Sequence, residues 1–126
     1  MFYFLVWSIG KHGPTKCLID KLRPLLHRHN VSAYFCGHDH SLQHISDTFE
    51  GSKVEHFVNG AGNFIEMSKR NIDKIPADSL KYNYRSWNLI YSGGFALVKA
   101  NKQNMKLHFI SAGGDELYTT TIYPRI

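Results

Sequence analysis

One stretch of the chain reads VSAYFCGHDH over residues 31–40. Its first residues are mostly apolar, aromatic or β-branched, which is typical of a buried strand. Gly37 ends that run, and His38 and His40 follow at the point where open α/β sheets carry their chemistry. Two imidazoles at positions i and i+2 of an extended segment point the same way, so they suit one metal ion or two adjacent ions. The spacing alone also fits loop histidines that make ordinary hydrogen bonds.

A second apolar strand and a helix are predicted before this stretch. Residues 2–8 form the strand, and residues 8–14, with two glycines and a proline, form the loop after it. Over residues 15–29 the leucines fall on one face of a helix. Strand, helix and strand make a βαβ unit, whose right-handed crossover keeps both strands parallel. The two loops then share one sheet edge, which brings His12 near His38 and His40, although a lone loop histidine also suits a plain polar surface.

The pattern changes to antiparallel pairing after Gln43. Residues 42–49 and 53–58 flank a Glu50-Gly51-Ser52 turn and predict a hairpin. Residues 94–100, 105–111 and 116–123 predict a meander with one packed face and one face in water.

Two further segments have no regular pattern. Gly60-Ala61-Gly62-Asn63 lets the backbone approach another group closely, although a plain turn fits equally well. Residues 64–92 are rich in aromatic residues, among them Tyr82, Trp87 and Tyr91, and a connection of this length is usually functional or mobile.

The composition is that of one ordinary globular domain, with 126 residues, 43% of them hydrophobic and 20% charged. The net charge of +5 and the eight histidines favour anionic partners in an acidic compartment. Lysines and arginines are scattered, which argues against a nucleic-acid partner.

Residues 1–7 are too few to span a bilayer and lack the features of a signal peptide, so no membrane partner is expected. Cys36 is predicted to be a buried free thiol, and Cys17 to open the helix.

Several segments, in the same order along the chain, resemble a known family. Gly37-His38-Asp39-His40 is similar to the Gly-His-x-His motif of the calcineurin-like metallophosphoesterase superfamily. Four segments of the chain resemble the carboxyl-terminal half of the animal purple acid phosphatases of the tartrate-resistant type. They are WSIGKHGPT at 7–15, LRPLL at 22–26, AYFCGHDHSLQ at 33–43 and GAGNF at 60–64. The resemblance implies an α/β fold in which residues 1–126 are a single partial domain. That domain would be part of an α/β/β/α metallophosphoesterase sandwich, one βαβ unit followed by antiparallel strands.

The same resemblance implies an activity and roles for three histidines. The activity is acid phosphatase-type hydrolysis of phosphomonoesters at a binuclear metal centre, Fe(III) paired with Fe(II), Zn or Mn. His38 and His40 would ligate one metal ion each, and His12 would touch the phosphate or protonate the leaving alkoxide. The substrate would be a phosphomonoester or phosphoprotein, and the protein would be secreted or lysosomal. In the family, the cysteine that matches Cys17 forms a disulfide with one in the amino-terminal half.

The chain also departs from the family pattern. The family takes a bridging Asp, a second Asp, a Tyr and an Asn from its amino-terminal half, and a further His from a Gly-His-Tyr-Pro segment. Here the positions of that last segment read Phe2-Tyr3-Phe4-Leu5. We therefore expect an incomplete metal site that is weakly active or inactive in this chain alone, with the missing amino-terminal half as a partner. The alternative is a non-catalytic metal-binding or protein-binding module, the latter using residues 64–92.

Overall fold

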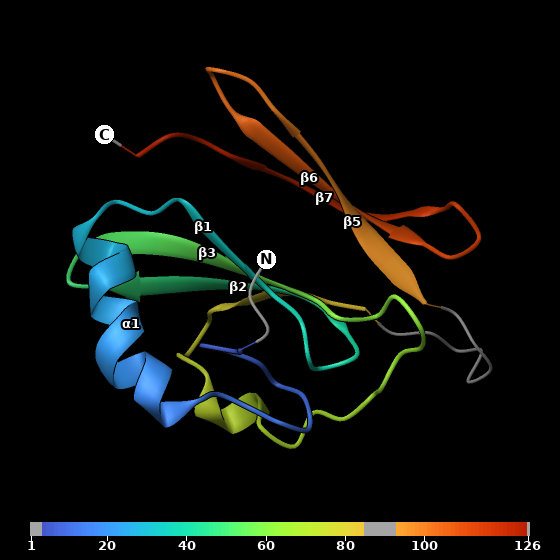
Figure 1. The fold of residues 1–126 in the computed structure, drawn as a ribbon, viewed down its shortest axis with the longest axis horizontal. Helices are drawn as coiled ribbons and strands as arrows, with labels where there is room; N and C mark the ends of the chain where they lie inside the picture. The colour runs from blue at the N-terminus through green and yellow to red at the C-terminus, as the bar shows by residue number, and fades with distance from the viewer. Residues whose placement is uncertain (1–3, 85–92, 126) are drawn as a thin grey trace.

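The computed structural model describes residues 4–84 and 93–125, which form two β-sheets and a helix beside one of them (Figure 1). The first sheet has the strand order β1-β3-β2-β4, with β1 at Ala33–Cys36, β2 at Leu42–Phe49, β3 at Ser52–Asn59 and β4 at Leu80–Asn83. The second has the order β5-β6-β7, with β5 at Gly94–Ala100, β6 at Met105–Ser111 and β7 at Glu116–Ile122. The helix α1 spans Lys16–Arg28, and a short 3-10 helix, η1, spans Ile72–Lys74.

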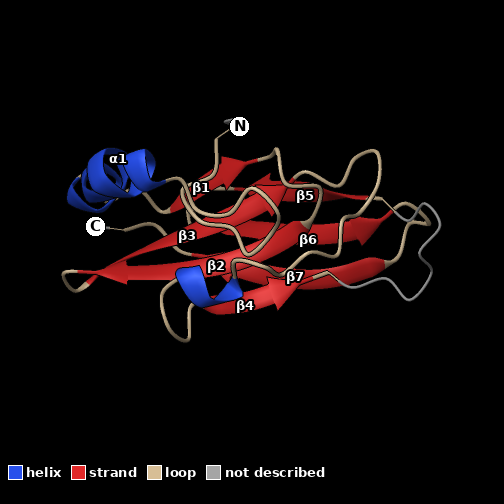
Figure 2. Cartoon of the chain, turned by 90° about the horizontal axis from the view of Figure 1, so that it is seen from below, coloured by secondary structure: helices blue, strands red, loops and turns tan. Residues whose placement is uncertain are grey.

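The helix and the two sheets form successive layers, each joined to the next by an apolar cluster. On one face of the first sheet, Ile45, Val54 and Val58 pack with leucines of α1. On the other face, Phe57 packs with Phe109 of the second sheet. Figure 2 shows the strands of the two sheets lying over one another. The predicted α/β class is confirmed, and the layers are consistent with part of a metallophosphoesterase sandwich.

The β2–β3 hairpin decides which side chains face each layer. Its turn residues Glu50 and Gly51 both have positive φ, 49° and 74°, as a tight hairpin turn requires. In the register of the hairpin, Ile45 pairs with His56 and His44 pairs with Phe57, so successive residues face opposite layers. The predicted hairpin and the carboxyl-terminal meander are both confirmed.

The predicted strand over residues 2–8 is wrong for its described part, residues 4–8, which form bends and coil. The segment is buried from Leu5 to Ile9, and its backbone groups bond to a side chain of β2 and to the residue before α1 rather than to the backbone of a neighbouring strand. The N–H of Ile9 donates to Oε1 of Gln43 (3.0 Å), and the carbonyl of Leu5 accepts from the N–H of Thr15 (3.2 Å). Because the backbone is satisfied in this way, the segment packs against α1 without joining the sheet. Within residues 4–84 the expected βαβ unit is therefore not formed, and β1 pairs in parallel with β3 instead.

The segment at 64–92 is more regular than predicted. It contains η1 and β4, and Tyr82 of β4 stacks on Tyr118 of β7 with ring centroids 4.4 Å apart. Tyr82 therefore belongs to the packing between the sheets, while Trp87 and Tyr91 lie outside the described residues.

Cys36 is buried and Cys17 exposed, and both are free thiols. No helix within residues 4–84 and 93–125 has the length and apolar character needed to cross a bilayer.

Candidate functional site

The rings of His12 and His38 lie next to each other beyond the carboxyl end of β1. Their centroids are 4.0 Å apart, with an angle of 36° between the ring planes. His12 belongs to the loop between the buried segment 5–9 and α1, and its side chain is 43% exposed. His38 is half-buried in the loop after β1. The structure thus brings these two histidines together by packing of loops rather than by a βαβ crossover, and their roles stay predictions.

His38 has an unusual backbone conformation. Its φ of 78° lies in the left-handed region, which costs a residue other than glycine on the order of 1–3 kcal/mol. Two short-range bonds close the loop around it, from the N–H of Asp39 to the carbonyl of Gly37 (3.1 Å) and from the N–H of Ser41 to the carbonyl of Asp39 (2.8 Å). Such strained residues cluster at functional sites, so the conformation favours a functional reading of this loop.

His40 lies at the end of the same loop and is held by the segment that follows β3. Its ring meets the ring of Phe64 edge-on, with centroids 4.2 Å apart, and its carbonyl accepts from the N–H of Glu66 (2.7 Å). Gly60 explains how that segment comes so close, because a Cβ on Gly60 would lie 1.9 Å from the carbonyl oxygen of Asp39. Gly60 is therefore required for this close approach, whereas a Cβ on Gly62 would meet open space.

Asp39 is the functional candidate that sequence reasoning missed. It is 1% exposed, and its Oδ1 lies 2.7 Å from Nδ1 of His12 and accepts the backbone N–H of the same residue at 3.0 Å. Its Oδ2 accepts the hydroxyl of Ser8. The one available signal was its place between two histidines, because alternation in the predicted extended segment turns the middle residue away from its neighbours. The structure has bends here, with His38 in the left-handed region, instead of an extended segment.

Two buried amides hold the loop that carries His12. Gln43 accepts from Ile9, and its Nε2 donates to the hydroxyl of Ser8 (3.0 Å). Nδ2 of Asn71 donates to the carbonyl of Gly10 (2.6 Å). Nothing in the sequence pattern pointed to Asn71, because it follows the loop by some sixty positions.

The metal-binding capacity of the site comes from imidazoles. Within the described part of the chain, no three or more His, Cys, Asp or Glu side chains are grouped so as to hold a metal ion. Cys36, at the end of β1, is buried, and burial raises the pKa of its thiol to about 12. His38 and His40 fit as part of the ligand set of Zn or Fe, since imidazole suits both metals. A centre with two protein ligands is mostly open and needs further donors.

Comparison with known proteins gives relatives of one kind, although no family model matches the chain. The chain is 42% identical over 120 residues to tartrate-resistant acid phosphatase type 5 of Homo sapiens. The matched region covers 95% of this chain and 35% of that protein. It is 42% identical over 111 residues to purple acid phosphatase 17 of Arabidopsis thaliana, covering 88% of this chain and 30% of the relative. The resemblance expected from the sequence is confirmed, and the chain spans about a third of the length of these relatives.

A solved structure shares the fold. It is described as GAP50, the anchor in the inner membrane complex of Plasmodium, and it matches with a TM-score of 0.71. The match covers 98% of this chain and 35% of that one, at 19% sequence identity. At that identity the likeness shows the fold alone.

Proposed function

We propose that this chain, whose sequence is similar to tartrate-resistant acid phosphatase type 5 over 95% of its length, carries part of the active site of an acid phosphatase. The reaction would be hydrolysis of a phosphomonoester, phosphoproteins included, in a secreted or lysosomal protein. The observation that carries the proposal is the contact between the rings of His12 and His38 at a strained Gly-His-Asp-His loop.

Three histidines would divide the chemistry. His38 and His40 would each ligate one ion of the pair, Fe(III) with Fe(II), Zn or Mn. When bound, such a pair lowers the pKa of a water and clamps phosphate oxygens for in-line displacement. His12 would contact the phosphate or protonate the leaving alkoxide through Nε2, since its Nδ1 is already engaged by Asp39. A positioned general acid of this kind contributes about 10²–10⁴ in rate.

The chain alone should hold metal weakly and turn over slowly or not at all. Two imidazoles leave most coordination positions open, and the remaining donors would come from the amino-terminal part of a longer protein or of a partner chain. A second reading, a protein-binding module, is favoured by the exposed apolar residues Phe95 and Leu97 on β5, which are 50% and 39% exposed.

Zinc binding by single-histidine variants tests the proposal. Equilibrium dialysis should show that His38→Ala and His40→Ala each weaken Zn²⁺ binding by about 10-fold or more, as expected when a ligand is removed. The matched control is His29→Ala, because His29 is exposed at the end of α1. Equal affinity in all four proteins would reject the assignment of His38 and His40 as ligands.

A further inference from the structure

We propose that Asp39 is a positioning residue that fixes the ring of His12 with its proton on Nδ1 and directs Nε2 toward the substrate. This inference rests on the proposed function of His12, and it assigns a role to the middle residue of the Gly-His-Asp-His loop.

The contact itself dictates the tautomer. Oδ1 of Asp39 lies 2.7 Å from Nδ1 of His12. An ionised carboxylate can only accept hydrogen bonds, so the nitrogen that faces it has to carry the hydrogen. In a neutral imidazole, Nε2 is then the unprotonated nitrogen, and in an imidazolium it is a second donor. In both states, Nε2 is the atom of His12 left for a phosphate oxygen or a leaving group.

The carboxylate is held in a cradle that leaves it little freedom. Its side chain is 2% exposed and its second oxygen accepts from Ser8. A Cβ on Gly10 would lie 2.5 Å from Oδ2, and a Cβ on Gly60 would lie 1.9 Å from the carbonyl oxygen. Glycines on both sides therefore let two chain segments close on Asp39. A group fixed in this way can hold a neighbouring ring within the narrow tolerance that catalysis needs.

The ring contact is more than the loop needs for its structure. Oδ1 of Asp39 already accepts the backbone N–H of His12 at 3.0 Å, and that bond anchors the loop together with the bonds from Gln43 and Asn71. Only the second contact, to Nδ1, selects a tautomer. Asp39→Asn keeps an oxygen that can accept from both N–H groups and removes only the charge, whereas Asp39→Ala removes the acceptor altogether.

NMR of the histidine rings provides the test. In the chain labelled with ¹⁵N-histidine, long-range ¹H–¹⁵N spectra at a pH where His12 is neutral report which ring nitrogen carries the hydrogen. The His12 signals are identified by their loss in His12→Gln. We expect the Nδ1–H tautomer in the unsubstituted chain, a shift toward Nε2–H in Asp39→Ala, and a smaller shift in Asp39→Asn. The control Asp115→Asn, at an exposed turn between β6 and β7, should leave the His12 signals unchanged.

Two results would overturn the inference. An Nε2–H tautomer in the unsubstituted chain would do so whether or not Asp39→Ala folds. An unchanged Nδ1–H tautomer in a folded Asp39→Ala chain would show that Asp39 does not set it. The readout is independent of phosphatase activity. Equal Zn²⁺ affinity in the His38 and His40 variants, together with Nδ1–H on His12, would therefore reject the proposed function alone. Weakened Zn²⁺ binding in those variants, together with Nε2–H on His12, would reject this inference alone.

Discussion

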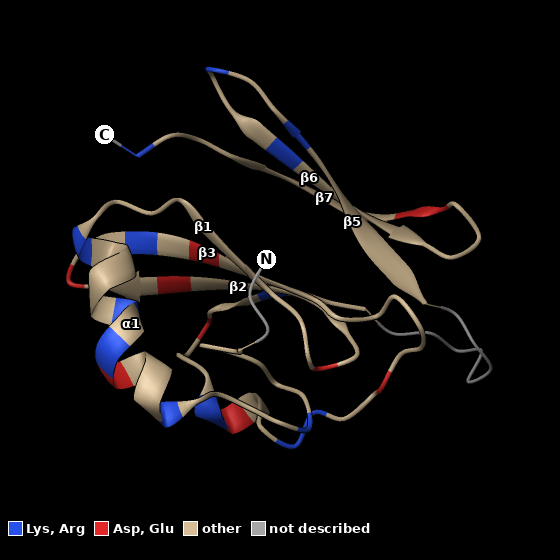
Figure 3. Ribbon diagram, in the orientation of Figure 1, with Lys and Arg blue, Asp and Glu red and all other residues tan. Residues whose placement is uncertain are grey.

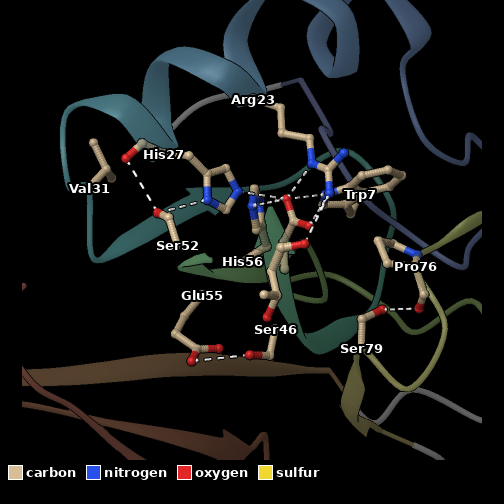
Figure 4. A network of polar contacts seen from close by, with 12 residues as sticks. Trp7, Arg23, His27, Val31, Ser46, Ser52, Glu55, His56, Pro76 and Ser79 are labelled. Atoms are coloured by element: carbon tan, nitrogen blue, oxygen red, sulfur yellow. Dashed lines mark hydrogen bonds and ion pairs between the residues drawn. The ribbon is translucent and has the colours of Figure 1, made fainter. Parts of the chain in front are cut away.

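Nε2 of His56 lies 3.8 Å from Oδ2 of Asp47, and within the described residues neither ring nitrogen of His56 has a hydrogen-bond partner. Figure 4 shows the side chains of Trp7, Arg23, His27 and His56 gathered in one place. Asp47 is already well supplied with donors there. It accepts from Nε1 of Trp7 (3.0 Å), from Nε and Nη2 of Arg23 (2.7 and 2.6 Å), and it contacts Nε2 of His27 at 3.0 Å. This cluster fastens α1 and the buried segment 5–9 to β2, with a neutral imidazole beside it.

The first prediction is that the folded state loses stability as the pH falls from about 6.5 to 4. Burial lowers the pKa of His56 from 6.5 to about 4, although Asp47 opposes the change. In that window the unfolded chain binds a proton that the folded chain excludes, so the free energy of unfolding falls by up to roughly 3 kcal/mol.

Asp47 and Glu55 act in the same direction at lower pH. Burial raises their pKa values, but hydrogen bonds led by Arg23 and His44 outweigh it and bring both to about 2. Their stabilisation is therefore present above about pH 4 and lost below it.

Urea unfolding at a series of pH values measures this effect. His56→Phe should give a stability that depends less on pH between about 6.5 and 4, because the group that titrates differently is gone. His29→Gln, at an exposed site, should follow the unsubstituted chain. If His56→Phe and the unsubstituted chain had the same slope, His56 would not be the buried neutral group described above.

The second prediction concerns the two carboxylates that pair with side chains of α1. Asp47→Ala should lower the free energy of unfolding by about 3–5 kcal/mol, because it leaves the mostly buried Arg23 and His27 without their acceptor. Asp20→Ala is the matched control, since Asp20 pairs with Lys16 at 2.6 Å in an exposed position. Surface pairs of that kind contribute at most about 1 kcal/mol. Similar losses for both variants in urea unfolding would mean that the Asp47 cluster does not anchor the helix.

The third prediction uses the two glycines of Gly60-Ala61-Gly62-Asn63. Gly60→Ala should destabilise the chain by at least about 2 kcal/mol, because its Cβ would overlap a backbone oxygen that cannot rotate away. Gly62→Ala should change stability by no more than about 0.5 kcal/mol, since the added atom meets open space. Thermal melts of the two variants decide the matter, and equal melting temperatures would contradict the close packing of Gly60 on Asp39.

The distribution of charge on the fold agrees with the scattered pattern along the sequence. Figure 3 shows Lys and Arg on α1, on the loops beside it and on the β5–β6 hairpin rather than on one face. The expectation that nucleic acid is not a partner stays a prediction.

The elements that were predicted correctly have signals contained within a few residues. The spacing of the leucines predicted α1. The alternation of apolar and polar residues on both sides of a short turn predicted the β2–β3 hairpin and the meander. The predicted strand was wrong for residues 4–8 because a strand and a buried irregular segment can have the same composition. The conformation of these residues depends on hydrogen bonds to Gln43 and Thr15, which lie outside any local sequence pattern. For the same reason His38 and His40 could be singled out by their spacing, while the role of Asp39 depends on a loop that the sequence does not place against it.

The measurement that tests the account most directly is phosphatase turnover in a chimera. Residues 6–126 replace the matching region of tartrate-resistant acid phosphatase type 5, so that the chimera keeps the Gly-His-Tyr-Pro segment that residues 2–5 of this chain lack. Hydrolysis of p-nitrophenyl phosphate is followed with and without substitutions. We predict a turnover number of about 1 s⁻¹ or more for the chimera. His38→Ala and His40→Ala should each lower it at least about 10-fold to 100-fold with loss of metal. His12→Ala should lower it by about 10²–10⁴ with metal retained, and His29→Ala should have no effect. A chimera that keeps full turnover after loss of His38 or His40 would contradict the claim that this chain supplies ligands to a phosphatase metal centre.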